Sequence, residues 1–300
     1  MRSGAFFVNI FCCADRAHFC ALILCRKTKI SHLMKILHLT SSSAAAGSLK
    51  QTCRLTVGGR NEVLALDHAF DVDAVPVDLS QDEIARCRKL AHSKYAPTEA
   101  VFEQLDDTDF ADFNKVIIWH TNHAQSLMFM FFICKNFNYP LYHIEKDLSV
   151  VTPISVEEYN QLVSSAKLIT EQEREQYISI YNSLIGTDGI PKVVEDGKIV
   201  CKSKDFVKSL ILDELGQKPE SVYPFVGKVY PKFYKRFGFD FAYIEMMILE
   251  LIQDEEIVPS DIETEPEDEH QSSFEFSISL DFFFRGKPIK DWFKFSISIA

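Results

Sequence analysis

The stretch from Met34 to Thr52 constrains the fold more than any other part of the chain. Lys35–Leu39 is a short apolar run, and it is followed by a loop of small residues, Ser41–Ser43 and Ala44–Ala46. The residues from Ala44 to Arg54 then have the composition of a helix, for which the serines are suitable caps. A buried strand that leads through a small-residue loop into a helix predicts the first unit of an α/β domain.

The pattern continues to about residue 150. Short apolar runs predict three more strands, and helical periodicity predicts helices between them. The expected strands are Glu62–Leu66, Lys115–Trp119 and Leu141–Glu145, and the expected helices are Gln81–His92, Thr98–Leu105 and Asn122–Lys135. Such alternation favours a mostly parallel, three-layer, Rossmann-like α/β sheet domain over residues 34–150.

Residues 151–258 have a different character and predict a smaller, mainly helical domain with a hairpin. Thr170 and Glu173 have the spacing of a capping box at the start of a helix. Asp196-Gly197 between two apolar runs predicts the turn of a hairpin over Ile190–Cys201. The other expected helices are Glu157–Ala166, Asp205–Leu215, Ser221–Phe237 and Phe241–Gln253.

The two ends of the chain differ from the rest. In residues 1–33, charged residues interrupt the apolar stretch that a secretory signal needs, and no run of about 20 apolar residues occurs that could span a membrane. We favour a misassigned start or a non-native leader there, because Lys35–Leu39 is so clearly a first strand. A short amphipathic anchor is the alternative. Residues 259–300 predict an acidic linker and a Phe-rich tail. Alternation in Phe274–Leu280 and Phe293–Ile299 predicts strands that dock on the body, pair with a partner or aggregate.

Charge and cysteine content exclude some classes of function. The net charge of −11 argues against a nucleic-acid-binding surface and against adhesion to an anionic membrane. The eight cysteines include no C-x-x-C pair after Met34, which favours a reduced, cytoplasmic protein. The composition identifies no cofactor.

Polar residues follow each predicted strand, and the carboxyl ends of parallel strands form the usual ligand-binding edge of an α/β sheet. The Ser-rich loop places hydroxyl and backbone N–H groups at a helix N-terminus, where an anion binds well. It lacks the lysine of a Walker loop and the glycines of a dinucleotide fingerprint. The alternative is that Ser41–Ser43 only cap the helix. The candidate ligand-binding residues are His38, Ser41, Ser42, Ser43, Gly47, Ser48, Asp67, His120 and Asn122.

Stronger chemistry is not indicated. His120 and His123 could join Asp67 or Glu145 at a metal, but their spacing is loose, and surface or capping histidines are the favoured interpretation. A triad of Ser48, His120 and Asp67 lacks a nucleophile elbow. The sequence therefore assigns no metal ligand and no catalytic residue.

Two segments carry a family resemblance. His38–Leu49 resembles the start of a bacterial family called domain of unknown function 1835, and Val116–Gln125 is similar to its second signature. Thr170–Ile257 resembles the companion domain of unknown function 3658. The chain departs from the family at Ser42-Ser43 and at Val75-Pro76. The resemblance implies an α/β domain followed by a second domain, and it implies no activity.

Two hypotheses of function follow. The first is a cytoplasmic protein, enzyme or not, that binds a small phosphate- or nucleotide-like anion at the strand-end edge. The second is a non-catalytic interaction or regulatory module, whose protein partner binds the second domain or the Phe-rich tail.

Overall fold

A computed structural model describes residues 34–55, 60–90, 105, 108–148, 154–216 and 220–260, together with 283–284, 287–288 and 296–299. Four predictions lie outside these residues: the leader over 1–33, the acidic linker beyond Ser260, the strand over 274–280 and, apart from Leu105, the helix over 98–105. The boundaries predicted for the two domains also stay a prediction.

The first part of the chain forms a mostly parallel sheet, as the sequence predicts. Its strands are β1 (Lys35–Thr40), β2 (Arg60–Ala65), β3 (Lys115–His120), β4 (Leu141–Glu145) and β5 (Lys167–Leu168), in the order β2-β1-β3-β4-β5. The first four are parallel, and the short β5 runs antiparallel to β4. Thr40 pairs with Ala65 and Trp119, and His120 with Glu145, so four carboxyl ends share one edge.

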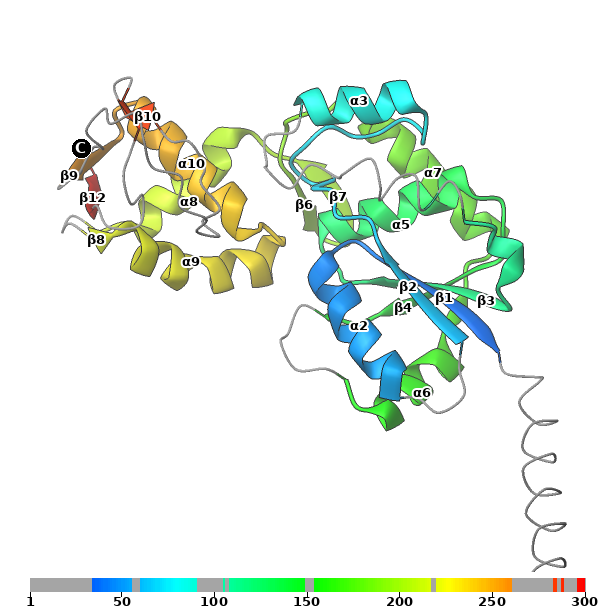
Figure 1. The fold of residues 1–300 in the computed structure, drawn as a ribbon. Coiled ribbons are helices and arrows are strands. Elements are labelled where there is room, and N and C mark those ends of the chain that lie inside the picture. Colours follow the sequence, from blue (N-terminus) through cyan, green and yellow to red (C-terminus); the bar gives the residue numbers. More distant parts are fainter. Residues whose placement is uncertain are drawn as a thin grey trace, which may run out of the picture.

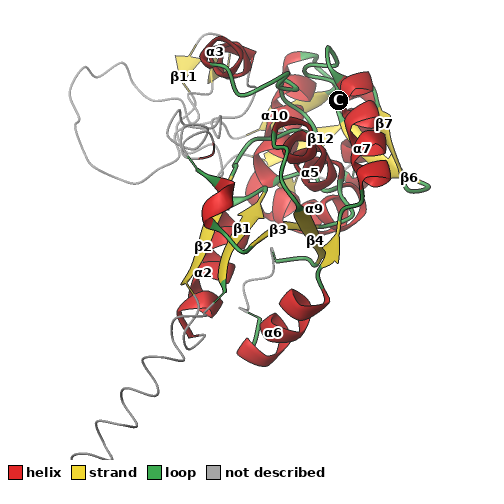
Figure 2. Cartoon of the chain, turned by 90° about the vertical axis from the view of Figure 1, so that its right-hand side faces the viewer, coloured by secondary structure: helices red, strands yellow, loops and turns green. Residues whose placement is uncertain are grey.

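Helices cover both faces of this sheet (Figure 1). Helices α2 (Ser43–Leu55) and α6 (Val156–Ser165) lie on one face, where they bury Ile36 and Ile117. Helices α5 (Ala124–Asn136) and α7 (Glu171–Leu184) lie on the other, over Leu37 and Ile118. Helix α3 (Gln81–Leu90) and the 3₁₀ turn η2 (Phe110–Asp112) are also on this side. Figure 2 shows the same three layers from the side. Because side chains alternate along a strand, consecutive residues of β1 and β3 supply the two cores.

Local signals in the sequence account for the helices around the sheet. Thr170 and Glu173 form the predicted capping box at the start of α7. Helix α5 is apolar on nearly all sides because the sheet covers one side and α7 another. The buried Arg174 holds the end of α5 in place, since its guanidinium donates to the carbonyl groups of Cys134, Phe137 and Tyr139.

The second part of the chain, from Lys192 onward, contains the predicted hairpin and three further helices. Strands β6 (Lys192–Glu195) and β7 (Lys198–Cys201) are joined by Asp196 and Gly197, whose φ values of 49° and 73° suit a two-residue hairpin turn. Helices α8 (Lys204–Glu214), α9 (Val222–Phe237) and α10 (Phe241–Gln253) follow and enclose a core of their own. Val193 belongs to this core, whereas Ile199 packs on the core below α5, so the hairpin connects the two.

The last described strand is part of the second core. Strand β12 (Ser296–Ile299) lies between β8 (Glu220–Ser221) and β9 (Ile257–Ser260), and Ile297 is fully buried there. Of the three alternatives for the tail strands, docking on the body therefore holds for this segment. Strands β10 (Phe283–Phe284) and β11 (Lys287–Pro288) form a separate antiparallel pair. None of the described helices is long and apolar enough to cross a membrane.

Candidate functional site

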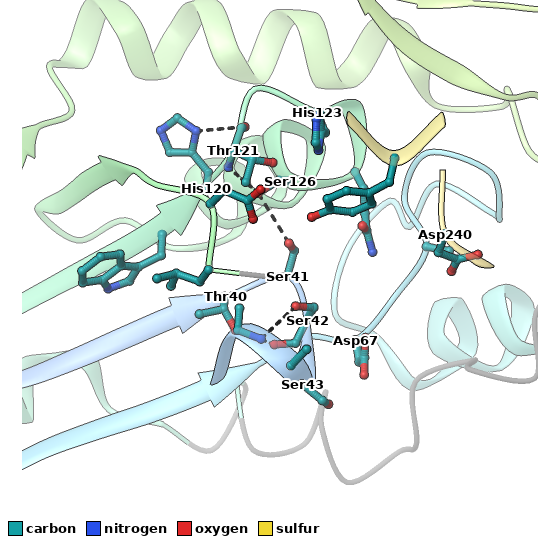
Figure 3. Close-up of a pocket in the computed structure, with 18 of the residues that line it drawn as sticks. Thr40, Ser41, Ser42, Ser43, Asp67, His120, Thr121, His123, Ser126 and Asp240 are labelled. Atoms are coloured by element: carbon teal, nitrogen blue, oxygen red, sulfur yellow. Dashed lines mark hydrogen bonds between the residues drawn. The ribbon is translucent and has the colours of Figure 1, made fainter. Parts of the chain in front are cut away.

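A cavity of about 320 Å³ opens at the carboxyl ends of β1 and β3. In the strand order, β2 is the neighbour of β1 on one edge and β3 is its neighbour on the other. The chain therefore turns in opposite directions after β1 and after β3. Such a switch point is where open α/β sheets bind their ligands. Polar residues of the cavity wall, several of them labelled in Figure 3, are Thr40, Ser41, Ser42, Ser43, Asp67, His120, Thr121, His123, Gln125, Ser126, Lys146, Asp147, Tyr230, Tyr234 and Asp240.

The Ser-rich loop forms the middle of this wall (Figure 3). Ser42 caps α2, because its Oγ accepts a hydrogen bond from the backbone N–H of Ala45 at 3.2 Å. The hydroxyl of Thr40 donates to the Ser42 carbonyl at 3.0 Å and thereby holds the turn. The backbone N–H groups of Ser43 and Ala44 belong to the first helical turn, so they have no partner within the helix. Both residues line the cavity.

Ser41 is the buried serine of the loop. Only 9% of the residue is exposed, and its hydroxyl lies 3.5 Å from the Oγ of Ser126. This separation is long for two hydroxyl groups, which usually approach to about 2.8 Å. Ser126 is already engaged, because its Oγ accepts from the backbone N–H of Thr121 at 3.0 Å. Ser41 is thus a nearly buried hydroxyl in the cavity wall with one weak partner.

Two histidines meet next to the loop. His120 Nδ1 lies 3.2 Å from the Thr121 carbonyl, and its Nε2 lies 2.9 Å from Nδ1 of His143. A neutral His120 donates from Nδ1 to the carbonyl and accepts at Nε2 from His143. Burial lowers the pKa of both rings, so the pair is uncharged at neutral pH. His120 is therefore a residue of the cavity wall that brings no positive charge.

Residues of α9 and of the start of α10, in the second part of the chain, also line the cavity. Tyr234 on α9 meets the His123 ring edge to face, with ring centroids 5.2 Å apart. Gly238 comes so close that a Cβ atom there would lie 2.7 Å from the Cβ of His123. Asp240 caps α10 by accepting from the N–H of Tyr243 at 2.7 Å. Its carboxyl lines the cavity on the same side as Asp67 (Figure 3).

His38 is held inside the fold and does not line the cavity. It is fully buried on the α6 side of the sheet, where Nδ1 accepts from Nε1–H of Trp119 at 2.9 Å. Neutral His38 therefore carries its proton on Nε2, which donates to the Tyr159 hydroxyl at 2.9 Å. Burial, with a smaller contribution from the charge of Lys115, lowers the pKa of His38 to about 3.

Five of the nine candidate residues line the cavity: Ser41, Ser42, Ser43, Asp67 and His120. Gly47 and Ser48 lie farther along α2, and Asn122 is exposed in the turn before α5. Ten further polar residues of the wall are not among the candidates. Seven lie at or after the ends of β1, β3 or β4, and three come from α9 or the start of α10, namely Tyr230, Tyr234 and Asp240. The sequence does mark the junction that holds Asp240, because Gly238 is a typical helix end and Asp240 a typical helix start.

Two further searches, for a metal site and for similar proteins, identify no function for the cavity. Within the described ranges, no group of three or more His, Cys, Asp or Glu side chains is arranged to hold a metal ion. Comparison of the chain with protein-family models, curated proteins and solved structures found no match. The resemblance to domains of unknown function 1835 and 3658 therefore stays a prediction.

Proposed function

We propose that this protein binds a small ligand with a phosphate or similar anionic group, and that the anion lies at the N-terminus of α2. The observation that carries this proposal is the position of the cavity. It lies at the switch point of the sheet, and the first turn of α2 forms part of its wall. The Ser41 hydroxyl lies in the same wall, and its bond to Ser126 is long at 3.5 Å, so it can turn to donate to a bound anion.

The charges of the wall limit the kind of anion. Among the described residues that line the cavity, Lys146 is the one lysine or arginine, and its Nζ is paired with Glu158 at 2.7 Å. Burial lowers the pKa of His123, which is therefore neutral like His120. Recognition then depends on backbone N–H groups, hydroxyls and the helix dipole. Such neutral donors suit a single phosphate better than a polyphosphate.

Thermal unfolding of the full chain with inorganic phosphate, phosphorylated metabolites and nucleotides tests this proposal. A ligand at about 100 times its dissociation constant adds about 2.7 kcal/mol to stability, which raises the midpoint by several degrees. Ser43→Asp places a carboxylate in the first turn of α2, where it occupies the anion position. The helix dipole favours a carboxylate there, so this variant should still fold.

Gln81→Asp is the matched control, because it makes the same change at the first residue of α3, outside the cavity. The expected result is a midpoint rise in wild type and in Gln81→Asp that is absent in Ser43→Asp. A rise that persists in Ser43→Asp, or no rise with any phosphate-bearing compound, would refute the proposal.

A further inference from the structure

The acidic side of the cavity gives information on the rest of the ligand. Asp67 lies two residues after the end of β2 and is half-buried in the wall. Its carboxylate forms no hydrogen bond and no ion pair with another residue of the described segments. Asp240 lies on the same side of the cavity (Figure 3). A carboxylate that faces a cavity without a partner is an unused acceptor of two or more hydrogen bonds.

Charge decides which groups can lie next to these carboxyls. Burial raises the pKa of Asp240, and the nearby charge of Asp67 raises it further. A second anionic group of the ligand would therefore be repelled on this side. Hydroxyl groups avoid the repulsion and supply the donors that Asp67 lacks.

The topology places Asp67 beside the proposed anion position. Strands β1 and β2 are parallel neighbours, so the start of α2 and the residues after β2 lie at adjacent strand ends. In open α/β sheets with a phosphate at the first helix, an acidic residue after the second strand, about 20 residues farther on, accepts hydrogen bonds from ribose hydroxyls. Asp67 occupies the equivalent place in this chain, although the loop before α2 has a different sequence.

We infer that the ligand joins one phosphate to a pair of adjacent hydroxyls, as a ribosyl 5-phosphate group does, and that Asp67 accepts hydrogen bonds from the hydroxyls. The inference rests on the proposed function, since the phosphate at α2 sets the position of the sugar. The cavity of about 320 Å³ is within the range of ordinary small-ligand sites. Tyr230 and Tyr234 of α9 lie in its wall and supply aromatic surface for a base or another planar group.

Titration of the full chain with four probes tests the inference: inorganic phosphate, ribose 5-phosphate, AMP and 2′,3′-dideoxy-AMP. The last two differ only in the two hydroxyls. AMP should bind at least about tenfold more tightly than the dideoxy compound, because hydrogen bonds to a charged acceptor are among the stronger ones. Asp67→Ala should abolish that difference and leave the binding of inorganic phosphate unchanged or slightly stronger.

Asp213→Ala is the control, since Asp213 is an exposed aspartate on α8, outside the cavity. It should retain the wild-type preference for AMP. If phosphate-bearing probes bind but ribose 5-phosphate and AMP gain nothing over the dideoxy compound, the inference is wrong and the proposed function stands. The same holds if the preference survives Asp67→Ala. If no probe binds the wild-type protein, the proposed function itself fails.

Discussion

Gly238 connects the second part of the chain to the cavity, and replacing it with alanine tests that contact. The residue ends α9 with φ at 87°, and its N–H donates to the carbonyls of Phe233 and Tyr234. A Cβ atom would lie 2.7 Å from the Cβ of His123, which is attached to the backbone and cannot rotate away. Gly186 is a matched control, since its φ is 86° and no heavy atom lies within 4 Å of its added Cβ.

The two glycines separate backbone strain from the clash. Alanine in the left-handed region costs about 1–2 kcal/mol at either position. Overpacking adds about 1–3 kcal/mol, and only Gly238 has a neighbour to meet. We therefore expect the free energy of unfolding to fall by about 1–2 kcal/mol in Gly186→Ala and by about 2–5 kcal/mol in Gly238→Ala.

Urea unfolding of the full chain at neutral pH measures both losses. The second half of the experiment uses His123→Gly, which removes the Cβ that would clash. His123 is the N-cap of α5 and makes no capping bond through its side chain, and glycine is accepted at that position. In this background Gly238→Ala should lose no more than Gly186→Ala does. Equal losses for the two glycine variants in wild type, or a loss unaffected by His123→Gly, would refute the reasoning.

Three further predictions concern residues outside the cavity. The pKa of His38 is about 3 in the fold and 6.5 in the unfolded chain, so the unfolded chain binds more protons between these two pH values. The free energy of unfolding therefore falls as the pH drops below about 6.5, by up to about 1.4 kcal/mol per pH unit. Urea unfolding at pH 7 and pH 5 should show a weaker pH dependence for His38→Gln than for wild type. Arg174→Met should lower the free energy of unfolding by about 2–4 kcal/mol, because three carbonyls lose a charged donor; a loss of a few tenths would contradict this. Ile297→Asp should lower it by about 3 kcal/mol or more, because a charge enters the second core, and unchanged stability would show that β12 does not dock there.

The sequence predicts one half of the cavity wall and not the other. The Ser-rich loop and the end of β3 could be placed together because parallel strands with helical connections have their carboxyl ends at one edge. Tyr234 and Asp240 come from helices more than 100 residues farther along, and no local pattern states where those helices pack. The contact between Gly238 and His123 is equally long-range.

Two of the candidate residues, His38 and Ser48, lie outside the cavity wall for simple physical reasons. His38 lies on β1 with the same alternation as Ile36, so it points to the face that α2 and α6 cover. That alternation could have been read from the sequence. Ser48 is more than one helical turn past the start of α2, and its hydroxyl is buried without a hydrogen-bond partner among the described residues.

The position of Trp119 provides the protein with a built-in optical probe. Trp119 is one of the residues that line the cavity, and its buried indole bonds to His38 and stacks on Tyr159 with an angle of 11° between the rings. The sequence contains two tryptophans, so a Trp292→Phe variant would leave Trp119 as the only indole emitter. Its fluorescence would then report ligand entry and the protonation of His38 from a single, unlabelled site, and the two signals could be separated by pH.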